Sequence, residues 1–156
     1  MKRTKKRLIF CCVLLVAMLA FIWGNSAMPA KESGALSGWV GQLLGKLLPF
    51  LSMENENSMY ILRKLAHFSE FAALGMILSW LFAMVTHKRI RQWIFPLLCG
   101  VAAACIDETI QIFSEGRYSS IVDVTIDSCG VLAGMIVLFL GYAIFKKLWE
   151  NRRKKT

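Results

Sequence analysis

The chain has 156 residues, of which 56% are hydrophobic and 19% charged, and its mean hydropathy is +0.53. A single domain with this composition is neither a disordered chain, a collagen-like chain nor a small disulfide scaffold. The net charge is +9, yet the basic residues stand in short blocks beside apolar runs rather than along one binding face. We therefore expect no nucleic-acid partner and interpret the chain as a membrane protein.

Four apolar stretches predict an all-α integral membrane protein with four transmembrane helices. About 20 helical residues, with a range of about 17–25, cross a hydrocarbon core of ~30 Å, and the first run, residues 8–24, reaches the lower end of this range on its own. The other three have shorter apolar cores and reach that length only by including polar neighbours. The predicted spans are therefore 8–24, 60–86, 93–113 and 121–145.

The positions of the basic blocks predict the orientation. Lysine and arginine concentrate in the tails 1–7 and 146–156 and in the loop 87–92. Because loops rich in these residues stay in the cytoplasm, we expect both termini and this loop inside the cell.

The first span also resembles a signal peptide, which leaves a three-helix alternative. Cleavage after Ala27 or Ala30 would place Asn25 or Met28 at the −3 position, where a small residue is needed. We therefore expect an uncleaved anchor.

The loop after the first span contains a helical pattern of its own. From Leu36 to Leu51, apolar residues recur at i, i+3, i+4 and i+7, with glycine and polar residues on the opposite face. This pattern predicts an amphipathic helix lying in the outer interface of the membrane, with a lid over the protein as the alternative. The five cysteines have no C-x-x-C spacing and are interpreted as small apolar fillers.

The polar extensions of the three shorter spans carry ionisable residues at one depth. Asp107 lies 14 residues after Trp93, which places it ~21 Å from the inner interface and in the outer third of the membrane. The charged groups of the other two helices lie at a similar height. We expect these residues to line an outward-opening polar pocket, which consists of Arg63, Lys64, His67, Glu70, Asp107, Glu108, Gln111, Arg117, Ser120, Asp123 and Asp127.

The residue types leave three uses of such a pocket open. The polar groups could only tie short helices together by hydrogen bonds. Alternatively, His67 with Asp107, Glu108, Asp123 or Asp127 could hold a divalent cation such as Mg²⁺, Mn²⁺ or Zn²⁺, and any other cofactor is left unknown. In the third interpretation, carboxyl groups and His67 exchange protons while arginine and lysine bind an anionic head group.

The order of these residues resembles that of the VanZ-like family of membrane proteins. The third helix and the following turn supply D-E-x-x-Q and G-R-x-x-S, and the fourth helix supplies D-x-x-x-D-x-x-G-x-x-x-G. In this sequence they are Asp107, Glu108, Gln111, Gly116, Arg117, Ser120, Asp123, Asp127, Gly130 and Gly134.

The resemblance extends to the first two spans. Lys64, His67 and Phe68 form a K-x-x-H-F pattern in the second helix, and Asn25, Ser26 and Pro29 follow the first helix as in the family. The resemblance covers about residues 20–141 and implies one VanZ-like domain over 1–156 with the first helix retained. Asp127 departs from the family pattern, in which an asparagine is expected.

The resemblance implies a role at the outer face of a bacterial cytoplasmic membrane, since the family's name comes from a protein linked to teicoplanin resistance. Our leading hypothesis is a pocket that engages a cell-envelope component and lowers susceptibility to teicoplanin-type lipoglycopeptides. Its expected partners are membrane lipids and either a lipid-linked envelope precursor or the lipoglycopeptide. The alternative is a carboxylate- or metal-dependent intramembrane enzyme acting on a lipid-linked phosphate or sugar. The sequence leaves catalysis and the oligomeric state open.

Overall fold

The computed structural model describes residues 2–29, 56–117 and 119–153, and every element within them is a helix. Helix α1 spans Lys2–Ala27, α3 Glu56–Val85, α4 Arg89–Ile112 and α5 Ile121–Arg153. Each of the four is long and apolar enough to cross a membrane, so the predicted all-α membrane architecture is confirmed at that level. The amphipathic helix expected from Leu36 to Leu51 lies outside the described residues, and the direction of crossing stays a prediction.

The outer helices run further than the predicted spans. Helix α1 already includes the basic segment 2–7, and α5 continues through 146–153. Lysine, arginine, leucine and glutamate are good helix formers and no glycine or proline interrupts them. Within the α5 extension, Lys146 Nζ lies 3.9 Å from Glu150 Oε1, one turn away, and the guanidinium of Arg153 lies 5.5 Å from the centre of the Trp149 ring. The tails predicted as basic segments are therefore largely helical.

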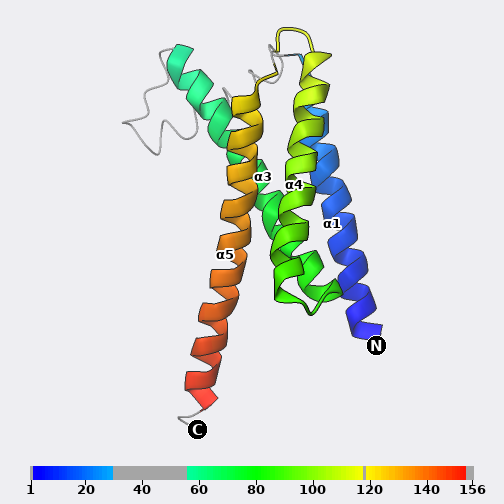
Figure 1. The fold of residues 1–156 in the computed structure, drawn as a ribbon, viewed down its shortest axis with the longest axis vertical. Helices are drawn as coiled ribbons and strands as arrows, with labels where there is room; N and C mark the ends of the chain where they lie inside the picture. Colours follow the sequence, from blue (N-terminus) through cyan, green and yellow to red (C-terminus); the bar gives the residue numbers. More distant parts are fainter. Residues whose placement is uncertain (1, 30–55, 118, 154–156) are drawn as a thin grey trace.

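The helices form a bundle in which α3 crosses behind the others at an angle (Figure 1). Helix α3 makes its most extensive contact with α5 and also packs on α1 and α4. Both chain ends and the α3–α4 turn lie at the lower end in Figure 1, whereas the end of α1, the start of α3 and the α4–α5 loop lie at the upper end. The predicted basic blocks therefore share one end of the bundle.

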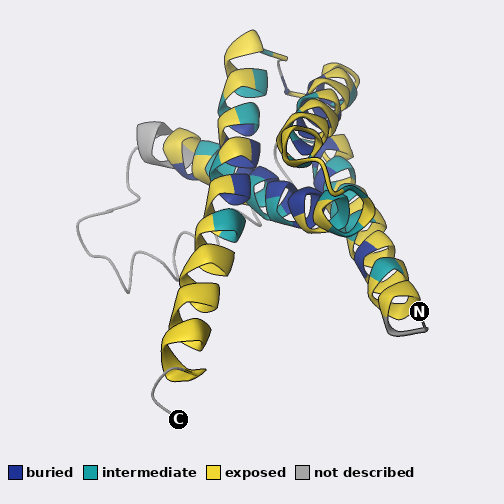
Figure 2. Cartoon of the chain, turned by 60° about the horizontal axis from the view of Figure 1, so that its bottom comes forward, coloured by how far each residue is buried: buried dark blue, intermediate teal, exposed yellow. Residues whose placement is uncertain are grey.

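The buried apolar side chains line the contacts between helices. They are Ile22, Phe71, Leu74, Leu78, Ala103, Ala104, Val131 and Met135. Large apolar residues such as Val16, Ile90, Leu98 and Val137 are exposed on the outside of the bundle, where Figure 2 shows mainly exposed residues. This distribution suits a protein whose outer surface contacts lipid rather than water.

Glycine allows α3 and α5 to approach closely. A Cβ atom at Gly134 would collide with the backbone carbonyl of Ala72, and one at Gly75 with the backbone of Val131. At Gly130 it would lie 2.5 Å from the carbonyl oxygen of Phe68. The Gly130-x-x-x-Gly134 spacing is thus used for packing within the chain, which is a common use of small residues between membrane helices.

All five cysteines have free thiols. Cys11 is fully buried and its Sγ lies 3.6 Å from the carbonyl oxygen of Ile77, whereas the other four are exposed. Among the described residues, which include all five cysteines, there is therefore no disulfide, and only Cys11 fills space inside the bundle as expected for a small apolar residue.

Candidate functional site

The polar residues singled out from the sequence converge at the upper end of the bundle. Six of the eleven are buried, namely His67, Asp107, Glu108, Gln111, Arg117 and Asp127. The other five are half-buried, namely Arg63, Lys64, Glu70, Ser120 and Asp123. We call these eleven residues the polar cluster. None of these eleven residues is fully exposed on the outside of the bundle.

Helical spacing explains why the polar cluster forms. Asp107 and Gln111 on α4 are separated by four residues and lie on one face, and Asp123 and Asp127 on α5 repeat this spacing. Gln111 Nε2 donates to Asp107 Oδ2 at 2.8 Å, which shows that the first pair is in contact. The short connection after α4 reverses the chain, so the two acidic faces meet across the bundle.

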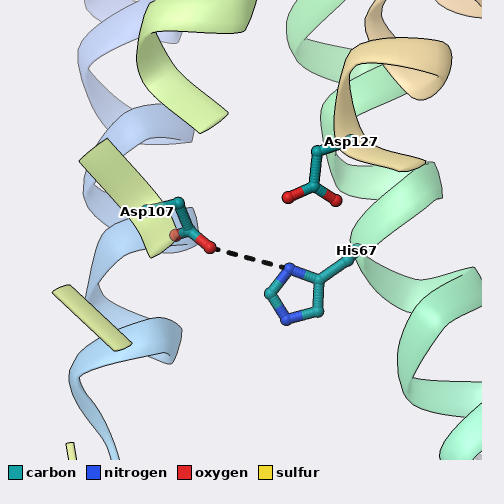
Figure 3. A group of neighbouring side chains, drawn as sticks. All are labelled: His67, Asp107 and Asp127. Atoms are coloured by element: carbon teal, nitrogen blue, oxygen red, sulfur yellow. Dashed lines mark ion pairs between the residues drawn. The ribbon is translucent and has the colours of Figure 1, made fainter. Parts of the chain in front are cut away.

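The centre of the polar cluster consists of one residue from each of α3, α4 and α5 (Figure 3). His67 Nδ1 lies 3.8 Å from Asp107 Oδ2, too far for a hydrogen bond. His67, Asp107 and Asp127 each have one atom that could bind a metal, a ring nitrogen or a carboxylate oxygen. These three atoms lie within 4.8 Å of one another. Figure 3 shows the three side chains pointing toward one another, and we call them the central triad.

An ion pair joins α3 to α5 beside the central triad. Lys64 Nζ contacts Asp123 Oδ1, and both side chains are about one-sixth exposed (16% and 15%). The ammonium group also lies 5.0 Å from the centre of the Tyr60 ring. Asp123 is thus already neutralised by a cation.

Glu108 is likewise engaged by neighbouring groups. Its Oε2 accepts a hydrogen bond from the backbone N–H of Ser120 at 2.8 Å, and its Oε1 accepts one from Gln111 Nε2 at 3.2 Å. These bonds tie the end of α4 to the residue that precedes α5. Of the residues predicted from the sequence as cation ligands, the structure groups His67 and Asp107 with Asp127, whereas Asp123 and Glu108 have other partners.

Helix α1 contributes three contacts that the sequence reasoning missed. Arg117 donates from one terminal nitrogen to the carbonyl oxygen of Asn25 at 3.0 Å, and Ser114 Oγ donates to that of Ser26 at 2.8 Å. Asn25 Nδ2 also lies 3.5 Å from Glu70 Oε1. Asn25 and Ser26 belong to the family-like segment after the first span, but the predicted pocket does not include them.

Arg117 lies in the α4–α5 loop, among charges of both signs. Burial, and then the positive charge of Arg63, lower the pKa of the Arg117 guanidinium, whereas Asp107, Glu108 and Glu70 raise it. Because an arginine starts from a pKa above 12, it remains cationic at neutral pH. Its Nε and second terminal nitrogen are buried without a hydrogen-bond partner, so Arg117 has unused donors inside the cluster.

A small depression opens beside the central triad. It is lined by Arg63, Lys64, His67, Glu108, Gln111, Asp123, Ile126 and Asp127. The space inside it that a water-sized sphere can reach is about 10 Å³, which is enough for about one water molecule. In this conformation the depression therefore admits a single ion, a water molecule or one oxygen atom of a larger ligand, and no complete head group.

Comparison with known proteins identifies the family. The family model described as VanZ/LLP1 matches residues 10–145, which is most of the chain and includes the whole polar cluster. A search of the curated proteins and a search of the solved structures gave no match. The resemblance seen in the sequence motifs is confirmed by this match.

Proposed function

The chain belongs to the VanZ/LLP1 family, and on that premise we propose that it binds a lipid-linked cell-envelope component at the outer face of a bacterial cytoplasmic membrane. By occupying this component, it lowers susceptibility to teicoplanin-type lipoglycopeptides, in line with the link between VanZ and teicoplanin resistance. The observation that carries the proposal is the convergence of five carboxyl groups and three cationic side chains at one end of a bundle whose exterior is apolar.

The orientation in this proposal has both termini in the cytoplasm. The basic tails and the basic α3–α4 turn lie at the same end of the bundle, opposite the polar cluster (Figure 1). Since basic segments stay on the cytoplasmic side, this arrangement supports an outward-facing cluster.

The ligand in this proposal is anionic and approaches from the membrane. Arg63 and Lys64 line the depression, and Arg117 has buried donors without a hydrogen-bond partner in the same cluster. Arginine side chains bind phosphate oxygens through paired N–H groups. Because the depression has room for about one small group, the proposed contact is between one phosphate oxygen and the rim, while the rest of the head group stays outside.

The proposal is tested by teicoplanin susceptibility of a sensitive Gram-positive host that carries the chain. We expect the wild type to protect and a triple variant, Asp107→Ala, Arg117→Ala and Asp123→Ala, to protect no better than an empty vector. The wild type and the variant must be compared at equal amounts of protein in the membrane. The matched control replaces three exposed polar residues of the same region, Glu115, Ser119 and Thr125, by alanine.

Two outcomes would contradict the proposal. The first is full protection by the triple variant, which would remove the polar cluster from the function. The second is a wild-type chain that gives no protection at all, which would separate this member from glycopeptide resistance.

One observation favours a second function, an intramembrane enzyme that acts on a lipid-linked phosphate or sugar. His67, Asp107 and Asp127 place an imidazole and two carboxyl groups within 4.8 Å of one another. These are the groups that general acid–base or metal-assisted hydrolysis uses. This alternative predicts that the purified protein releases phosphate or sugar from such a lipid and that Asp127→Asn abolishes turnover.

A further inference from the structure

We infer that the central triad binds one divalent transition-metal ion, with Zn²⁺ as the ion it fits best, held by His67, Asp107 and Asp127. This inference concerns the same cluster as the proposed function but does not depend on it, because a metal can bind whether or not the protein affects antibiotic susceptibility.

The spacing inside the central triad is close to that of ligands around one ion. Zinc–nitrogen and zinc–oxygen bonds are about 2.0–2.2 Å long, so two ligand atoms of one tetrahedral zinc lie roughly 3.3–3.6 Å apart. The 3.8 Å between His67 Nδ1 and Asp107 Oδ2 is slightly longer than this distance and is too long for a hydrogen bond. All three ligand atoms lie within 4.8 Å of one another, so closing around one ion requires an inward movement of up to roughly 1.5 Å.

Asp127 is a buried carboxylate whose partner is unaccounted for. Its exposed fraction is 1%, its Oδ2 has no hydrogen-bond partner, and the carboxyl group points toward His67 and Asp107 (Figure 3). Asp107, which is fully buried, also has one oxygen without a partner. A buried carboxylate without a partner is costly, and a bound cation removes that cost.

The charge of the polar cluster also calls for a divalent cation. Among the described residues of the cluster, the carboxyl groups are Glu70, Asp107, Glu108, Asp123 and Asp127, and the cationic groups are Arg63, Lys64 and Arg117. With all eight groups ionised, five negative charges face three positive ones, which leaves a net charge of −2 in the cluster. One M²⁺ ion balances this charge, whereas the competing explanation is the uptake of two protons.

The donor set selects the kind of ion. One imidazole with two carboxylates suits zinc and related first-row metals better than Mg²⁺ or Ca²⁺, which prefer oxygen ligands alone. Gln111 Nε2 donates a hydrogen bond to Asp107 Oδ2 at 2.8 Å and so orients that carboxylate. Residues next to metal ligands commonly do this.

A three-residue ligand set leaves one coordination position free for water or a ligand oxygen. His67 and Asp127 both line the depression, where Arg63 and Lys64 also stand. If the proposed function holds, the free position receives the phosphate oxygen of the lipid ligand, and this last step alone rests on that function.

The test is a zinc titration of the purified full chain in detergent after chelator treatment. We expect about one Zn²⁺ per wild-type chain, read by elemental analysis and by calorimetry. We expect a loss of affinity on the order of 100-fold or more in Asp127→Asn, a substitution of nearly equal size. Glu115→Gln, which removes an exposed carboxylate of the α4–α5 loop, should bind zinc like the wild type.

His67→Gln provides a second variant, so that the result does not depend on the folding of one mutant, and size-exclusion profiles report on folding of each. Stoichiometric zinc that is lost in both folded variants and kept in Glu115→Gln supports the inference. A wild-type chain that takes up no stoichiometric zinc, or an Asp127→Asn variant that binds it as tightly, overturns it in favour of protonated carboxyl groups. Because no antibiotic is present, this result is independent of the susceptibility assay.

Discussion

The contact between α3 and α5 is built in two different ways along its length. In the middle of the bundle, Gly75, Gly130 and Gly134 let the backbones touch, and side chains are missing where the helices meet. Toward the upper end, Lys64 and Asp123 hold the same two helices together by an ion pair. The glycine contact therefore fixes the distance between the two helices. The polar contact depends instead on charged side chains, which can form ion pairs with other groups.

This division explains how a charged cluster is tolerated in a bundle with an apolar exterior. Polar side chains alone contribute little to membrane-helix association, about 0.6 kcal/mol per hydrogen bond on average. The close backbone packing below the cluster supplies van der Waals contact that does not depend on charge. The polar residues are then held in place by helices that are already fixed.

The largest expected effect comes from filling the glycine contact. Gly134→Ala places a methyl group against the Ala72 carbonyl, and we expect a loss of about 1–3 kcal/mol in the free energy of unfolding. The measurement is unfolding of the purified protein in mixed detergent–SDS micelles. Gly141→Ala on the same helix is the matched control, because nothing lies within 4 Å of a Cβ atom there. Equal stability of both variants would show that the close approach is not what fixes the helices.

An intermediate effect is expected for the ion pair. Lys64→Ala and Asp123→Ala should each destabilise the protein, and the double variant should lose less than the two single losses together. We expect a coupling energy up to about 1.7 kcal/mol, the upper value found for polar pairs between membrane helices. A double-mutant cycle in the same unfolding assay measures it. Strict additivity of the two losses would mean that the pair does not hold α3 to α5.

The smallest expected effect concerns the docking of α1. Ser114→Ala removes the hydrogen bond to the Ser26 carbonyl and should cost about 0.6 kcal/mol. Ser69→Ala is the control, because Ser69 is exposed and bonds only to Ala66 of its own helix. A Ser114 variant as stable as the control would indicate that α1 is held by its apolar contacts alone.

Much of the fold follows from hydrophobic length and charge placement. The four spans were predictable because each must bury about 20 residues in hydrocarbon, and the polar extensions of α3, α4 and α5 were visible as interruptions of that pattern. The helical ends were less predictable. Basic tails such as 146–153 have no apolar pattern, and their helicity follows from propensity and from continuity with α5.

The members of the site were predictable, but their pairing was not. Spacing of i, i+4 places Asp107 with Gln111 and Asp123 with Asp127 on helix faces, and the structure brings these faces together. Which carboxylate faces His67 depends on the rotation of α5 against α3, which the glycine contact determines. The sequence-based cation set therefore included Asp123, whereas the structure pairs Asp123 with Lys64 and places Asp127 beside the imidazole.

The hydrogen bond from Ser114 to the end of α1 also has a consequence for biosynthesis. Ser26 is translated 88 residues before Ser114, so at 5–20 residues per second the first helix waits about 4–18 s in the membrane for its partner. Throughout that interval the carbonyl groups of Asn25 and Ser26 lack the donors that Arg117 and Ser114 later supply. The end of the first helix to be made is thus among the last parts to gain its hydrogen bonds, and ribosomes stalled before residue 114 should carry a first helix that can pack on α3 but lacks these two bonds.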